Sequence, residues 1–170
     1  GGTSQATPHV AGAMAVLRSS FPNETLSSLE SRLTANGTLL PDARTGRTHP
    51  RLNLVAAARP INDDFANATG IVGSAGVAVG SNRLATLEAA EPVTAGTAGQ
   101  SVWWQWTAPA AGQVSLDTLG SIVDTRLDVY AGGSIGTLTS VAGNDNSDGG
   151  STSALRFQAQ AGTTYRWTVS

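Results

Sequence analysis

Residues 2–12 read Gly-Thr-Ser-Gln-Ala-Thr-Pro-His-Val-Ala-Gly, which places a serine in a turn directly before an Ala-rich helical segment. Gly2 permits a tight backbone and a close approach of substrate, and the N-terminus of the helix adds partial positive charge. A serine hydroxyl is a poor nucleophile at neutral pH, so acyl transfer needs a base for its proton and N–H donors for the oxyanion. The stretch therefore predicts either a nucleophile turn at Ser4 or, as the structural alternative, a helix N-cap at Ser4.

Composition limits the classes of function that the chain can have. Its 170 residues suffice for one ordinary domain or two small ones, and 40% apolar residues support a globular core. The formal net charge is −2 and 13% of the residues are charged, so no basic face is available for phosphates or anionic membranes. Without cysteine, neither disulfides nor thiolate metal sites can form. Nucleic acid and membranes are therefore not expected as partners.

The first sixty residues have helical patterns. Residues 12–17 are apolar or small on every side, which predicts a helix that is buried all round. A second, amphipathic helix is expected after Thr25 as its N-cap, with Leu26, Leu29 and Leu33 on its apolar face. The pair at positions 36–37, Asn-Gly, predicts a left-handed stop.

A polar loop is expected after this stop, followed by a short helix over residues 54–58. Asn53 is its candidate N-cap, and Pro60 would end it.

From about residue 60 the hydrophobic spacing changes to period two, which indicates β-strands. Half-buried strands are expected in segments 101–107, 126–129, 155–158 and 165–169, with Gly- and Asn-rich turns between them. This pattern favours antiparallel strands stacked as a β-sandwich. In the first segment, Trp104 and Trp106 share a face with Val102, whereas Trp103 lies on the other face.

The stretch at residues 2–12 is similar to the nucleophile segment of the subtilisin-like serine proteases. Residues 49–58 resemble the last Asn-containing helix of that family, so the resemblance covers residues 1 to about 60. It implies that residues 1–60 form the helical C-terminal piece of an α/β catalytic domain. It also implies that Ser4 is the nucleophile, that its backbone N–H is an oxyanion donor, that the Thr3 hydroxyl supports this oxyanion hole, and that Gly2 lies beside the substrate.

Three functional residues of the family have no counterpart in this sequence. The family places its catalytic Asp, its catalytic His and its oxyanion Asn before the serine in the chain. His9 is expected to point away from Ser4 along the same helix, and His49 is expected in a polar loop. We therefore expect that Ser4 and Thr3 act together with an upstream part of their own catalytic domain. The substrates are expected to be polypeptides, and no cofactor is expected. The 170-residue chain alone is expected to be inactive.

Residues 61–170 resemble the bacterial pre-peptidase C-terminal domain, through motifs at residues 62–68, 85–88, 101–109, 124–130 and 161–165. The resemblance implies an all-β antiparallel sandwich, jelly-roll-like, that is appended to secreted bacterial proteases for secretion or for engaging substrate. An extracellular location is thus expected for the protein. The alternative interpretation is a non-catalytic module for binding polymers or for secretion.

Two further sites are candidates from the sequence. Trp103 could contact substrate, since its side chain is expected to lie on the face opposite Trp104 and Trp106. Asp145 and Asp148 could bind structural Ca²⁺, together with Asp63, Asp64 or Glu88 if folding brings them near. The EF-hand pattern itself fails, because Asn stands at the first position of that loop and Leu at the twelfth.

Overall fold

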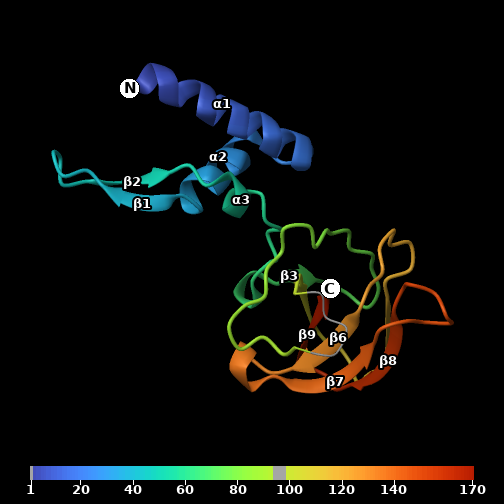
Figure 1. Ribbon diagram of the computed structural model, residues 1–170. Coiled ribbons are helices and arrows are strands. Elements are labelled where there is room, and N and C mark those ends of the chain that lie inside the picture. The colour runs from blue at the N-terminus through green and yellow to red at the C-terminus, as the bar shows by residue number, and fades with distance from the viewer. Residues whose placement is uncertain (1, 94–98) are drawn as a thin grey trace. The chain divides into compact units, whose positions relative to one another are not determined.

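The computed structural model describes residues 2–93 and 99–170, and the chain divides into two compact units (Figure 1). The N-terminal unit ends at Arg59 and the second, here called the β unit, is Pro60–Ser170. Each has a hydrophobic core of its own. The division lies one residue before the boundary that the change of hydrophobic period predicts.

The N-terminal unit contains three helices: α1 (Thr3–Ser20), α2 (Leu26–Ala35) and α3 (Leu54–Ala57). Both predicted N-caps are confirmed, because the Ser28 N–H donates to Thr25 Oγ1 and the Ala56 N–H donates to Asn53 Oδ1, each at 3.2 Å. Each bond satisfies a backbone donor that the first turn of a helix leaves without a partner. The caps thus set where α2 and α3 begin.

A hairpin of β1 (Thr38–Pro41) and β2 (Thr48–Arg51) replaces the polar loop that the sequence suggested. Asp42 closes its turn by accepting hydrogen bonds from Thr45 Oγ1 at 2.8 Å and from the Arg44 N–H at 2.9 Å. These bonds lower the pKa of the Asp42 carboxyl. His49 therefore lies on a strand rather than in a loop, and it remains exposed there.

Two expectations for the helices are wrong. Among the described residues of α1 only Ala13 and Leu17 are buried, because this small unit offers the helix a single packing face, formed around Leu29, Leu33 and Ala57. The helix is therefore not buried all round.

The left-handed stop after α2 is also wrong. Asn36 has a φ of −99°, and Gly37 is needed for space, since a Cβ there would lie 2.5 Å from the Cβ of Pro50. The glycine thus lets the hairpin pass close to the end of α2.

In its described residues, 60–93 and 99–170, the β unit has strands and two short 3₁₀ helices. In chain order these are η1 (Phe65–Asn67), β3 (Thr69–Ile71), β4 (Val102–Thr107), β5 (Gly112–Asp117), β6 (Leu127–Ala131), η2 (Ile135–Thr137), β7 (Thr139–Asn144), β8 (Ala154–Ala159) and β9 (Thr164–Val169). One sheet has the order β3-β4-β9-β6-β7 and a second pairs β5 with β8. All pairs in the unit are antiparallel except β3 with β4, so the expectation of a wholly antiparallel arrangement is wrong for one pair.

The two sheets share one hydrophobic core. The alternating residues predicted for the strands supply most of it: Val102, Trp104, Leu127, Val129, Tyr165 and Trp167 from the larger sheet, and Leu155 and Phe157 from β8, which also contributes Ala159. Figure 1 shows β6, β7, β8 and β9 gathered in the same part of the unit. The period-two pattern therefore identified the core of the β unit.

The opposite face of the larger sheet is also covered, which the sequence did not indicate. Trp103 is fully buried there against Ala68 and Tyr130, and the Phe65 ring meets it edge-on with centroids 5.2 Å apart. The segment around η1 therefore covers this face. The assignment of Trp103 as an exposed contact for substrate is wrong, because its side chain belongs to a core.

Truncating this side chain tests its burial. We expect Trp103→Ala to lower the free energy of unfolding of the β unit by about 3–5 kcal/mol, the range for large aromatic truncations in cores. All four tryptophans lie in this unit, so urea unfolding followed by tryptophan fluorescence reports on it alone.

The matched control is Val79→Ala, whose side chain is 96% exposed and whose truncation should change the free energy of unfolding very little. Equal, small effects of both substitutions would contradict the burial of Trp103.

Candidate active site

Ser4 occupies the first turn of α1 and is exposed. The first backbone hydrogen bonds of the helix run from Gln5 and Ala6 to the carbonyl of Gly2, at 3.1 and 3.2 Å. The N–H groups of Thr3 and Ser4 precede these bonds, and at a helix start such groups have no partner within the helix. The Ser4 N–H therefore stands next to its own hydroxyl at the positive end of the helix dipole, as an oxyanion donor must.

The N-cap of α1 is Gly2, so the structural alternative for Ser4 as a helix cap is wrong. Gly2 has a φ of +132°, which residues with a side chain rarely adopt, and no side-chain cap bond forms at this end. A glycine is thus required by the backbone, and the absence of a side chain leaves the approach to Ser4 open.

Pro8 lies inside α1, four residues after Ser4. Proline has no N–H, so the carbonyl of Ser4 lacks its usual helical donor, and the ring crowds that carbonyl. Thr7 Oγ1 donates to the neighbouring carbonyl of Thr3 at 2.8 Å. The helix nevertheless continues without a break from Thr3 to Ser20.

Neither histidine approaches the Ser4 hydroxyl as a base. His9 is exposed, and its Nδ1 forms a 2.8 Å hydrogen bond with the carbonyl of Gln5 in its own helix. His49 is exposed on β2 and lies opposite Leu40 in the hairpin. Within the described residues, the Ser4 side chain has no hydrogen-bond partner.

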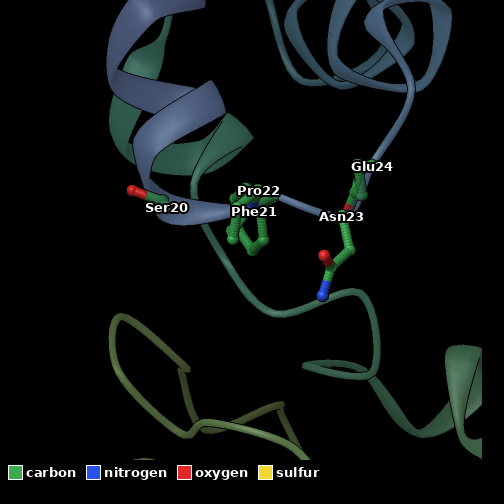
Figure 2. A pocket seen from close by; sticks show the side chains of 5 residues that line it. All are labelled: Ser20, Phe21, Pro22, Asn23 and Glu24. Atoms are coloured by element: carbon green, nitrogen blue, oxygen red, sulfur yellow. The ribbon is translucent and has the colours of Figure 1, made fainter.

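Behind the first turn, one arginine connects the C-terminal end of α1 to α2 and α3. Arg32 Nε donates to Glu24 Oε2 at 2.9 Å, and its Nη1 donates to the Arg59 carbonyl at 2.9 Å. Its guanidinium also stacks over the ring of Phe21 at 4.0 Å from the centroid. Figure 2 shows Phe21 and Glu24 in the connection between the helices, beside a small hollow that residues 20–24 line.

Sequence reasoning missed this arginine because its partners lie up to 27 residues away, and no local pattern reports such a contact. The hairpin, in contrast, had a signal. Asp42 is followed by Thr45 and by Gly46, whose φ is +68°, and this combination is typical of a tight turn.

The remaining candidates from the sequence are the carboxylates suggested for calcium. Asp145 and Asp148 are exposed in the turn between β7 and β8, whereas Asp63 accepts from Thr86 Oγ1 and Glu88 accepts from the Phe65 N–H. Across the part of the chain that is described, no three His, Cys, Asp or Glu side chains gather so that they could hold a metal ion. The calcium site that the sequence suggested thus lacks a cluster of carboxylates in the described residues.

The match to a family model agrees with this geometry at the start of the chain. Residues 1–54 match the model of the subtilase family. This match supports a subtilisin-like protease region over these residues. This subtilase region contains α1, α2 and the hairpin, and it includes the turn that presents Ser4. No curated protein and no solved structure matches the chain.

Protonation of Glu24 should weaken the contacts that hold α1, α2 and α3 together. The hydrogen bond from Arg32 holds the pKa of Glu24 below its ordinary value of 4.5, although burial opposes this. A carboxyl whose pKa is lower in the folded state contributes stability above the pKa of the unfolded chain and loses it as the pH falls through the folded value. We therefore expect the helices to melt at a lower temperature once the pH falls below about 4.5.

Far-UV circular dichroism of thermal unfolding between pH 7 and pH 3 would measure this. Glu24→Gln should lower the melting temperature at pH 7 and flatten its pH dependence. Glu30→Gln, which removes the same charge from an exposed position of α2, is the control and should do neither. An unchanged pH profile in Glu24→Gln would contradict the role given to this pair.

Proposed function

We propose that the protein is a serine endopeptidase of the subtilisin type, with Ser4 as its nucleophile. The observation that carries this proposal is the subtilase match over residues 1–54 together with the exposed Ser4 in the first turn of α1. The aspartate, the histidine and the oxyanion asparagine come from an upstream part of the same catalytic domain, in the chain order of the family. Within the described residues no histidine can serve as the base, which supports this division of roles.

The reaction follows from the chemistry of the site. The histidine removes the hydroxyl proton of Ser4 as its oxygen attacks the peptide carbonyl, and the N–H of Ser4 donates to the resulting oxyanion. The Thr3 hydroxyl supports this oxyanion hole, and the open space at Gly2 admits the substrate backbone. The histidine then protonates the leaving amine, and water hydrolyses the acyl-enzyme on Ser4. No cofactor takes part in these steps.

The β unit is proposed as a jelly-roll-like sandwich of the pre-peptidase C-terminal type. Its two sheets share a core, and its motifs lie in the order that the resemblance requires, which supports this assignment. The protein acts outside the cell, and the β unit serves secretion or the engagement of polypeptide substrate. No described helix has the length and apolar character that crossing a membrane requires.

Labelling with a fluorophosphonate tests the nucleophile, because the reagent modifies only an activated serine. In the native secreted product we expect the label on the peptide that contains Ser4, identified by mass spectrometry. Ser4→Ala should abolish labelling and peptide hydrolysis, since loss of the nucleophile in subtilisin lowers turnover by about 10⁶-fold. Ser19→Ala, on the same helix and exposed, is the control and should keep both.

The 170-residue chain by itself should remain unlabelled, because its serine has no base. Labelling of that chain at Ser4 would show that it holds its own base and would contradict the upstream origin of the histidine. Labelling of the native product at another serine, with none at Ser4, would overturn the proposed nucleophile.

A further inference from the structure

Strand β5 presents a free edge. It pairs with β8 alone in its two-stranded sheet, with a regular register from Gly112 opposite Ala159 to Asp117 opposite Ala154. Beyond that ladder, no described residue forms a backbone hydrogen bond to residues 112–117. Every second residue of such a strand turns its N–H and C=O away from its partner, so the far edge of β5 holds a row of free donors and acceptors.

Two bonds show which residues face outward. The Thr118 N–H donates to the Ser153 carbonyl at 2.8 Å, so positions 118, 116, 114 and 112 bond to β8. The alternate residue Ala154 on β8 turns its N–H away from β5 and donates to Asn144 Oδ1 at 3.1 Å, as this alternation requires. The backbone groups of Gln113, Ser115 and Asp117 therefore point to the free edge.

Proteins usually protect an exposed edge with prolines, lysines, bulges or very short strands. The other sheet follows this rule: β3 is only three residues long, and the pairing of β6 with the edge strand β7 shifts between Val129 and Tyr130. By contrast, β5 is six residues long and regular, and it contains neither proline nor lysine. Its edge is thus open to a further strand.

A groove lies across both strands of the small sheet, at the end of the ladder where Asp117 pairs with Ala154. It has a volume of about 560 Å³, and the exposed side chains of Ser115 and Asp117 from β5 and of Arg156 from β8 are among those that line it. Leu119, in the loop after β5, and Asp148, in the turn before β8, also line it, and the Leu119 side chain is 72% exposed. The groove thus offers an apolar contact and charges of both signs to the side chains of a neighbouring strand.

We propose that the edge of β5 binds an extended polypeptide segment, which adds to the small sheet as a third strand. Its backbone pairs with Gln113, Ser115 and Asp117, and side chains on one of its faces enter the groove. An unfolded segment is the occupant that fits, because its backbone groups are unpaired and complement the free row. A second copy of the chain fits less well, since a six-residue edge covers far less than the ~800 Å² per partner of a stable dimer.

The assignment of this segment as substrate rests on the proposed function. Binding through the main chain depends little on sequence, as a protease that acts on many unfolded polypeptides needs. A weak site on the same chain as the nucleophile raises the local concentration of substrate near the catalytic domain. The β5 edge is therefore a second contact for substrate that takes no part in the chemistry.

The test uses the 170-residue chain and a fluorescein-labelled peptide, acetyl-Thr-Val-Thr-Val-Lys-Val-Thr-amide, with fluorescence anisotropy as the readout. Its matched control is the same peptide with N-methyl groups at the three valines, and a second control carries them at the alternate residues. We expect the unmodified peptide to bind. Alternate residues of an added strand turn their N–H groups toward β5, so one of the two methylated peptides lacks those donors. That peptide should bind at least tenfold more weakly. Equal binding of all three peptides would overturn the proposal.

Substitutions in β5 locate the site. Gln113→Pro deletes an outward N–H and should weaken binding at least tenfold. Gln113→Ala keeps that N–H and changes a side chain that does not line the groove, so it should bind as the unsubstituted chain does. Ser115→Pro provides a second deletion in the middle of the strand. If circular dichroism shows that the proline variants do not fold, amide hydrogen exchange of the unsubstituted chain provides the test. The amides of Gln113, Ser115 and Asp117 should exchange more slowly when the peptide is added.

Three outcomes separate the hypotheses. Peptide binding without protection of these amides would overturn the β5 assignment. Sedimentation that shows self-association of the chain, lost in Ser115→Pro, would assign the edge to a second copy instead. The binding assay needs no catalysis, so it is independent of the labelling of Ser4. Failure of the peptide to bind would overturn the β5 proposal and leave the proposed nucleophile standing. Binding of the peptide without any labelled serine would overturn only the assignment of the bound segment as substrate.

Discussion

Burial of strand β4 on both of its faces is the constraint on which the β unit depends. Trp104 faces the core shared by the two sheets, and Trp103 faces the second cluster with Phe65 and Tyr130. The backbone of Trp103 is held from the side as well, because its N–H donates to the Asn62 carbonyl and its carbonyl accepts from Asn62 Nδ2, both at 2.8 Å. The segment at the start of the unit is therefore part of the fold and not a linker.

The same segment anchors the long connection between β3 and β4. Asp63 accepts hydrogen bonds from Thr86, and Glu88 accepts one from the Phe65 N–H. Ala85, directly before Thr86, packs into the main core. A connection whose described residues contain no helix or strand after β3 is thus held in place by a few part-buried hydrogen bonds to carboxylates, which are stronger than bonds to neutral acceptors.

The N-terminal unit shows a different balance. Its small core and the Arg32 contacts hold α1 at its C-terminal half, while Val10 and Val16 are exposed on the same helix. Ser4 lies at the other end, in the first turn of the helix and four residues before Pro8. Ser4 is thus exposed at the end of a helix whose other half is packed, so the proposed role as nucleophile would require partner groups from another surface.

The sequence by itself determined the elements whose signals are local. Thr25 and Asn53 set the helix starts, and alternation identified β4, β6, β8 and β9 with most of their core residues, because caps and periods depend on neighbours within a few residues. The Gly-Thr-Ser stretch indicated the turn of Ser4. Alternation did not identify β3, β5 and β7. Only the tertiary structure decided that Trp103 is buried, that α1 is largely exposed and that β5 has a free edge. Each of these depends on which distant segment covers a surface, and the period of a strand indicates its two faces without indicating what packs on either.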